Sequence, residues 1–208
     1  MILNLKQLNE FIVYRHFKME SLQSALNFMS KNCWMASIVW KEAYYSFNFA
    51  EKYIKFLHFI FKGHLYEFTA LPNGFAAGSR LFTKNYKTSF FTFPETFHVD
   101  DSLLFGKSID ECRQNIMKTV DLSLKCGFLV HPVKSVFEPY QIIEYLGFVL
   151  NSKEMTVKLT ENRVEKLKLS VSCLLNTKNP QFSKCLKLLV RWLQVFQVCY
   201  MDLFIIDA

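Results

Sequence analysis

Two adjacent carboxylates, Asp100 and Asp101, are the residues of this sequence with the clearest capacity for chemistry. They separate two apolar runs, and if those runs are strands, the pair lies at the tip of a β-hairpin, held rigidly and facing solvent. Carboxylate oxygens are hard ligands that suit Mg²⁺. In two-metal phosphoryl transfer, one ion activates the attacking hydroxyl and the other stabilises the leaving pyrophosphate. The alternative interpretation of the pair is a solvated turn.

Two further segments combine basic and aromatic side chains. Residues 53–62 mix tyrosine, phenylalanine, lysine and histidine, which either stack on a nucleic-acid strand or form the core and surface positions of a hairpin. Residues 161–175 are predicted to form a helix that carries Arg163, Lys166 and Lys168. These side chains either follow phosphates or form a solvated face, and the sequence leaves both alternatives open.

Composition narrows the class of protein. The 208 residues are 51% apolar, so a sizeable core can be buried. A net charge of +7 and a pI near 9.0 favour a polyanionic partner such as nucleic acid. Six scattered cysteines without zinc-ligand spacing, and early N-terminal charges, predict a cytoplasmic or nuclear protein that is not secreted. Arg191 and Asp202 interrupt the apolar stretch 186–206, so we expect no membrane association.

The elements that must position these residues follow from periodicity. Helical spacing is present in residues 19–29, 76–84 and 108–127. In the last of these, Ser108 and Glu111 form a capping-box pattern, and Gly127 ends the helix. Thr160 is expected to cap a basic amphipathic helix.

Strands are expected between these helices. The predicted strands cover residues 36–39, 56–61, 65–70, 143–150 and 155–159, with hairpin turns around 62–64 and 151–154. Helices and strands in this irregular order indicate an α+β domain rather than a doubly wound sheet.

Five motifs, in order along almost the whole chain, resemble the reverse-transcriptase domain of eukaryotic retroelements. The motifs are residues 35–46, residues 71–75 with 82–84, His98-Val99-Asp100-Asp101, Gly127 with residues 131–135, and residues 144–148. Upstream, residues 2–9 and 16–22 resemble the entry from fingers to palm in gypsy-like and tyrosine-recombinase-type elements.

This resemblance implies a right-hand polymerase palm, an antiparallel sheet backed by helices, with partial fingers and the start of a thumb. It assigns residues 1–13 and 47–77 to the fingers, 14–46 and 78–155 to the palm, and 156–208 to a partial thumb. It implies RNA-directed DNA polymerisation on primer–template nucleic acid from deoxynucleoside triphosphates. Two Mg²⁺ ions are the cofactor that it implies, with no other small-molecule cofactor.

The resemblance also implies roles for individual residues. Asp100 and Asp101 would be metal ligands, and Lys134, otherwise an exposed loop lysine, would face the triphosphate. The nucleotide would contact Tyr44, which excludes the ribose 2′-hydroxyl, and Pro72, Asn73 and Gly74, which lie under the nascent base pair. The primer end would be held by Tyr145, Leu146, Gly147 and Phe148.

Three departures from the family pattern accompany the resemblance. Val39 stands where the family has its third catalytic aspartate, and an isopropyl group cannot bind Mg²⁺. Glu42 is three residues further on and is not expected to replace it. His98 replaces the usual aromatic residue, and residues 85–97, which include Pro94, are shorter than the family segment.

We therefore expect a catalytically impaired polymerase domain. The alternatives are a non-catalytic nucleic-acid-binding remnant and a purely structural partner protein.

Overall fold

The computed structural model of the chain describes residues 3–13, 15–17, 21–90, 95–98 and 100–176. The chain forms two compact units, residues 1–28 with 36–139 and residues 29–35 with 140–208. Pro94 and the apolar stretch 186–206 lie outside the described residues. Among the described residues, no helix combines the length and the apolar character needed to cross a membrane.

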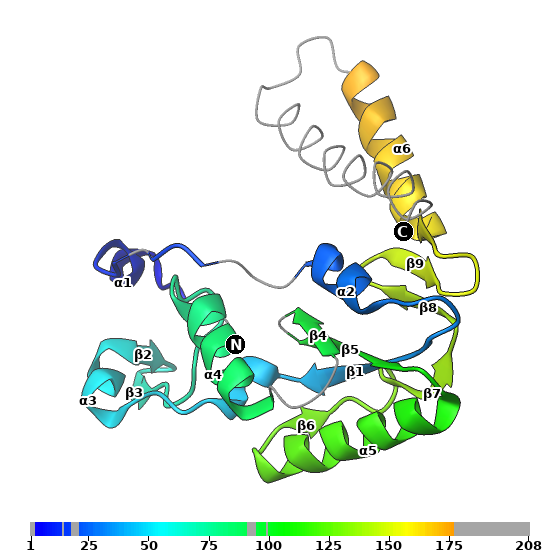
Figure 1. The fold of residues 1–208 in the computed structure, drawn as a ribbon. Helices are drawn as coiled ribbons and strands as arrows, with labels where there is room; N and C mark the ends of the chain where they lie inside the picture. Colours follow the sequence, from blue (N-terminus) through cyan, green and yellow to red (C-terminus); the bar gives the residue numbers. More distant parts are fainter. Residues whose placement is uncertain (1–2, 14, 18–20, 91–94, 99, 177–208) are drawn as a thin grey trace. The chain divides into compact units, whose positions relative to one another are not determined.

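A five-stranded sheet forms the centre of the first unit (Figure 1). Its order is β4 (Glu95–His98), β5 (Asp101–Gly106), β1 (Trp34–Lys41) and β6 (Leu129–Val130), and β7 (Val136–Tyr140) also pairs with β1. Apolar side chains of β1 and β5, such as Ile38 and Leu103, are fully buried. The sequence pattern does not reveal β6 or β7, because β6 has two residues and β7 contains Pro139, a residue that disfavours strands.

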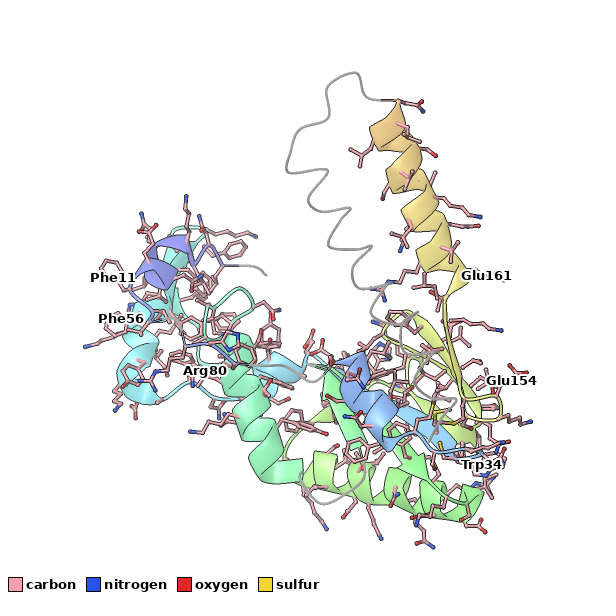
Figure 2. The ribbon with its side chains drawn as sticks, turned by 45° about the horizontal axis from the view of Figure 1, so that its top comes forward. Phe11, Trp34, Phe56, Arg80, Glu154 and Glu161 are labelled. Carbon is pink, nitrogen blue, oxygen red and sulfur yellow. The ribbon has the colours of Figure 1, made fainter. Side chains whose placement is uncertain are left out.

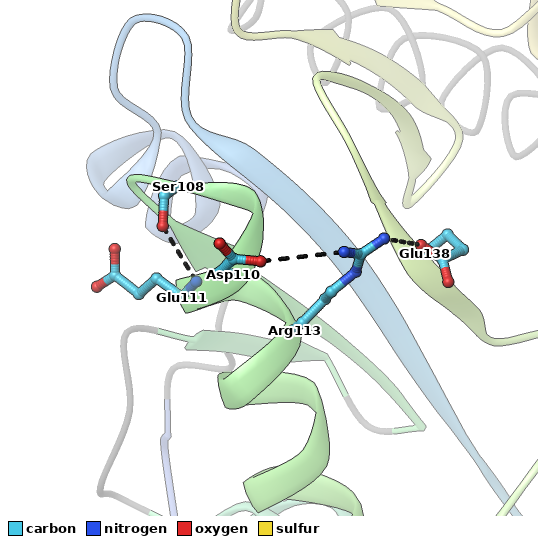
Figure 3. Close-up of polar contacts among 5 residues, drawn as sticks. All are labelled: Ser108, Asp110, Glu111, Arg113 and Glu138. Carbon is cyan, nitrogen blue, oxygen red and sulfur yellow. Dashed lines mark hydrogen bonds and ion pairs between the residues drawn. The ribbon is translucent and has the colours of Figure 1, made fainter.

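Helix α5 (Ile109–Lys125) covers this sheet and has the two ends that the sequence predicts. At its N-terminus, the Ser108 hydroxyl accepts a hydrogen bond from the Glu111 backbone N–H at 3.1 Å (Figure 3). At its C-terminus, Gly127 has φ +80°, and the Phe128 N–H donates to the Ser123 carbonyl at 2.8 Å. This is the hydrogen-bond pattern with which a left-handed glycine ends a helix.

An ion pair joins α5 to β7. Arg113 lies 3.0 Å from Glu138 and 4.0 Å from Asp110 (Figure 3). Its side chain is half exposed, so this pair contributes only about 0–1 kcal/mol. Side chains buried between α5 and the sheet therefore hold the helix in place. Two buried hydrogen bonds add to this packing. The Asn115 amide donates to the Phe105 carbonyl at 2.8 Å, and the Trp40 indole N–H donates to the Ser123 hydroxyl at 3.0 Å.

Helix α4 (Gly78–Phe90) packs on an aromatic cluster. Phe82 and Tyr86, one turn apart, are both buried, and the ring centroids of Tyr86 and Trp40 are 5.0 Å apart. Phe82 also contacts Phe47 and Phe128. The helix begins two residues after the predicted start at position 76 and ends at Phe90, beyond the predicted end at Lys84, and the buried Tyr86 continues its apolar face past that predicted end.

Short elements complete the first unit. They are α1 (Lys6–Glu10), α2 (Leu22–Phe28), the 3-10 helices η1 (Ala43–Ser46) and η2 (Lys55–Leu57), α3 (Glu51–Ile54), and the hairpin strands β2 (His58–Phe61) and β3 (His64–Glu67). The face predicted for α2 is confirmed, since Leu22, Ala25 and Leu26 are buried.

The second unit is a three-stranded antiparallel sheet followed by a helix. Its strands are β8 (Ile142–Tyr145), β9 (Phe148–Asn151) and β10 (Thr156–Leu159), and the helix is α6 (Glu161–Leu175). The segment 29–35 joins this unit because the Ser152 hydroxyl donates to the Cys33 carbonyl at 2.6 Å and the Asn32 N–H donates to the Ser152 carbonyl at 2.9 Å.

Two expectations for this unit are wrong. Residues 143–150 are not one strand, because Leu146 (φ +49°) and Gly147 (φ +76°) make a two-residue turn between β8 and β9. The turn lies inside an apolar run, so alternation alone does not reveal it. Thr160 precedes α6 but does not cap it with its side chain; its hydroxyl donates to the Gly147 carbonyl at 3.3 Å instead.

Candidate functional site

The carboxylate pair lies at the tip of the β4–β5 hairpin, as the sequence predicts. His98 and Asp101 are cross-strand partners, which places Asp100 in the turn and Asp101 at the first position of β5. Asp100 is exposed and Asp101 is partly buried. The backbone therefore places two consecutive carboxylates at the tip of this hairpin, at one end of the β4 and β5 strands.

Position 39 in the central strand lies beside this tip. The Trp40 backbone N–H donates to the Asp100 carbonyl at 2.8 Å. Since Trp40 is buried and neighbouring residues of a strand point to opposite faces, Val39 presents its side chain to the other face. Val39 is partly buried there. Position 39, where the resemblance leads us to expect a third carboxylate, thus lies in the strand that contacts the hairpin tip.

The loop 131–135 fixes the backbone of Val39 from the other side. The Val39 N–H donates to the Ser135 hydroxyl at 2.9 Å, and the His131 N–H donates to the Val39 carbonyl at 2.7 Å. Lys134 belongs to this loop and is exposed. The fold therefore brings Lys134, by its backbone, next to position 39, while its contact with a triphosphate stays a prediction.

Tyr44 lies in η1, directly after β1, and contacts α4 with both its ring and its hydroxyl. The hydroxyl is 2.9 Å from the Ser79 hydroxyl, and the ring stacks on Phe82 with centroids 5.2 Å apart. A Cβ at Gly78 would lie 3.2 Å from the Tyr44 ring, so the ring packs closely against this glycine. Burial raises the pKa of Tyr44, the Ser79 hydrogen bond lowers it, and the negative charge of Asp100 raises it.

The predicted nucleotide loop, Pro72 to Gly74, is held by side-chain hydrogen bonds at Asn73 and Gly74. The Asn73 amide donates to the Tyr45 hydroxyl at 3.2 Å, next in sequence to Tyr44. Asn9 donates from its side chain to the Gly74 carbonyl at 2.9 Å and accepts from the Ala76 N–H at 2.8 Å. Asn9 has no sequence signal for this role, because its partners are more than 60 residues away along the chain.

The predicted primer-holding residues form the β8–β9 turn of the second unit. Tyr145 and Phe148 are buried cross-strand partners that flank Leu146 and Gly147. Arg163 donates to the Leu146 carbonyl at 2.7 Å, and its guanidinium lies 4.5 Å from the centre of the Phe148 ring. Burial lowers the pKa of Arg163.

Arg163 of the basic helix packs on the β8–β9 turn through its guanidinium. Contact of this helix with phosphates stays a prediction. Lys166 and Lys168 are exposed.

The residues present do not fit a two-metal centre. In the described part of the chain, no group of three or more histidine, cysteine, aspartate or glutamate side chains is placed to hold a metal ion. Glu42 does not fill the gap, since it is exposed and has a left-handed backbone (φ +53°) after the end of β1. Among the described residues, Asp100 and Asp101 are the two predicted metal ligands, and the structure groups no third acidic, histidine or cysteine side chain with them.

A separate apolar groove lies elsewhere in the first unit. It has a volume of about 770 Å³ and is bounded by α1, α3 and the start of α4. Aromatic side chains dominate its lining, among them Phe11 and Phe56 (Figure 2). Tyr53 and Phe56, from the aromatic and basic segment 53–62, line this groove, whereas the residues predicted to bind metal, nucleotide or primer do not.

Comparisons with known proteins agree with this geometry. Residues 1–150 match a family model described as reverse transcriptase (RNA-dependent DNA polymerase). No curated protein matches the chain.

Solved structures of a foamy viral protease–reverse transcriptase share the fold. One, the dRH form in complex with double-stranded DNA, matches with a TM-score of 0.74 and 18% sequence identity. The match covers 92% of this chain and 32% of the foamy viral chain. Another complex with double-stranded DNA has a TM-score of 0.72 and 18% identity, covering 92% of this chain and 39% of the foamy viral chain. A third, with an RNA/DNA hybrid, has a TM-score of 0.70 and 17% identity, covering 91% of this chain and 25% of the foamy viral chain. This chain thus spans about a third of the length of those proteins, and the predicted α+β polymerase fold is confirmed.

Proposed function

This chain belongs to the reverse transcriptase (RNA-dependent DNA polymerase) family, and from this premise we propose that it binds primer–template nucleic acid but extends the primer poorly or not at all. The observation that carries the proposal is the hydrogen bond between Trp40 and Asp100. It holds the two-aspartate tip against the strand that carries Val39, at the position where the resemblance leads us to expect a carboxylate.

The physical reason for impairment is the donor set. Reverse transcriptases use divalent metal ions, and such ions need oxygen ligands and negative charge. Two adjacent carboxylates provide too few ligands and too little charge for two ions. Loss of a ligand of this kind reduces the rate by a factor of ~10³ or more, on the order of 4 kcal/mol in the activation free energy.

The remaining residues support binding. Tyr44, fixed by Ser79 and Phe82, would contact the sugar of an incoming deoxynucleotide. Asn73 and Gly74 would lie against the nascent base pair, and Lys134 would face the triphosphate. The related foamy viral structures contain double-stranded DNA or an RNA/DNA hybrid, which supports a nucleic-acid partner for this chain.

Primer extension on a primed RNA template tests the proposal. We compare the unmodified chain with Val39→Asp, with the uncharged isostere Val39→Asn, and with Val39→Asp combined with Asp100→Asn. We expect extension only from Val39→Asp, accompanied by tighter Mn²⁺ binding measured by electron paramagnetic resonance. Extension by the unmodified chain that is lost on Asp100→Asn would refute the impairment.

The same experiment distinguishes the impaired polymerase from the alternative, a non-catalytic nucleic-acid-binding remnant. The presence of Val39 is consistent with both. A remnant binds primer–template but extends nothing, even as Val39→Asp. A purely structural partner protein binds no nucleic acid at moderate salt.

We also propose a retroelement origin of the gypsy-like or tyrosine-recombinase type. Its support is the resemblance of residues 2–9 and 16–22 to those elements. Genomic sequence flanking the coding region tests it, since an adjacent integrase or tyrosine-recombinase reading frame would distinguish the two types.

A further inference from the structure

The β2–β3 hairpin of the first unit has two chemically different faces. Its strands are joined by a two-residue turn at Lys62 (φ +50°) and Gly63 (φ +79°). Because side chains alternate along a strand, Phe59 and Phe61 share one face with their cross-strand partners Tyr66 and His64. The opposite face carries Ile60 and Leu65, with the paired His58 and Glu67.

The aromatic face is preorganised and accessible. Phe59 and Tyr66 stack across the strands, with ring centroids 5.5 Å apart and planes inclined by 19°. Phe61 lies 6.4 Å from Tyr66, and the two side chains are 51% and 45% exposed. The Lys62 ammonium lies over the Phe61 ring, 5.5 Å from its centre. Flat rings and a cation are thus fixed together at the end of a hairpin.

This chemistry matches an unpaired nucleic-acid strand. Every base has a π-face that can stack on an aromatic side chain, and a neighbouring lysine neutralises a phosphate. The charge is complementary as well, because the Lys62 ammonium lies at the aromatic end of the hairpin, whereas Glu67 contacts His58 on the other face. The exposed aliphatic pair, Ile60 and Leu65, provides neither stacking nor positive charge.

We propose that the aromatic face of the β2–β3 hairpin binds unpaired nucleic acid, separately from the site at Asp100. This inference rests on the proposed function in one respect: in a primer–template complex, the bound strand is the unpaired part of the template. Contacts made by this surface are independent of base sequence, since stacking and phosphate neutralisation do not read base edges.

The two faces provide a matched experiment on the full chain. Phe61→Ser with Tyr66→Ser removes the aromatic face, and Ile60→Ser with Leu65→Ser removes the same number of exposed apolar side chains from the other face. Fluorescence anisotropy measures binding to labelled oligo(dT), to a blunt duplex, and to the same duplex with a 5′ overhang. Circular dichroism confirms that both variants keep the thermal transition of the unmodified chain.

We expect the aromatic-face variant to lose roughly tenfold or more in affinity for oligo(dT) and for the overhang duplex. Its affinity for the blunt duplex stays unchanged, and the Ile60/Leu65 variant behaves like the unmodified chain. Equal losses from both faces, or no loss from the aromatic face, overturn the proposal. So does a change of self-association in sedimentation without a change in oligo(dT) binding.

A different result of the same experiment would refute the proposed function and leave the hairpin surface supported. If the unmodified chain does not bind the blunt duplex, binding of primer–template is refuted, while aromatic-face-dependent binding of oligo(dT) still supports this surface.

Discussion

Tyr44 shows at the scale of a single residue how neighbours set chemistry. Its hydroxyl contacts Ser79, its ring stacks on Phe82, and the charge of Asp100 acts on it. Burial is the largest influence and disfavours the charged phenolate, so the pKa is raised. The group predicted to contact the sugar is therefore coupled to the hairpin tip predicted to bind metal.

This coupling predicts how the pKa of Tyr44 depends on its neighbours. The stability contributed by neutral Tyr44 is fully present below the ordinary tyrosine pKa of about 10 and is lost as the pH rises beyond it, because the unfolded chain releases the proton first. We expect Ser79→Ala to raise the pKa further and Asp100→Asn to lower it. Ultraviolet difference titration against Tyr44→Phe measures both shifts. Identical curves for the three proteins would contradict the coupling.

At the scale of elements, the start of α6 and the β8–β9 turn form one structure. The Thr160 backbone N–H donates to the Gly147 carbonyl at 3.2 Å, in addition to the hydrogen bond from Arg163 to the Leu146 carbonyl. Gly147 has φ +76°, a conformation that glycine adopts without the strain of a side chain. An added Cβ would lie 3.0 Å from Nη1 of Arg163, so the arginine side chain would have to shift.

Two glycines test this arrangement. Gly147→Ala and Gly63→Ala both place alanine at a left-handed turn position, at a cost of about 1–2 kcal/mol in the free energy of unfolding. Gly63 has open space around it, whereas Gly147 contacts Arg163. We expect Gly147→Ala to lower the free energy of unfolding more than Gly63→Ala in urea denaturation. An equal effect would show that Arg163 moves aside without loss.

At the scale of the whole molecule, charge is the property that acts on a polyanion. The chain has 25 lysines and arginines against 18 aspartates and glutamates. Neutralised phosphates release counterions, so affinity for nucleic acid decreases with salt.

We expect the affinity for nucleic acid to depend steeply on salt concentration. For about five neutralised phosphates, the association constant decreases roughly twentyfold for each doubling of salt concentration. Anisotropy titrations of a labelled primer–template at several salt concentrations measure the slope. A slope near zero would contradict binding through phosphates and would leave the purely structural alternative.

The sequence by itself determined the features that depend on near neighbours. Asp100 and Asp101 lie at a hairpin tip because turn residues between two strands specify the hairpin locally. Ser108 and Gly127 end α5 for the same reason, since caps act within one helical turn. Two local features were predicted wrongly. The β8–β9 turn continues the apolar pattern of the strands around it, and the Thr160 hydroxyl donates to the Gly147 carbonyl instead of capping α6.

Only the tertiary structure decided which distant residues meet. Ser135 binds the backbone of Val39 across 96 positions of sequence, Asn9 holds the Gly74 loop, and Arg163 packs on the β8–β9 turn. These contacts depend on how strands pair and helices pack, and no local propensity encodes them. The sequence identifies Val39 as a missing carboxylate through resemblance alone. Its position beside Asp100 follows from the pairing of β1 with its neighbours, because backbone hydrogen bonds fix which residues lie side by side.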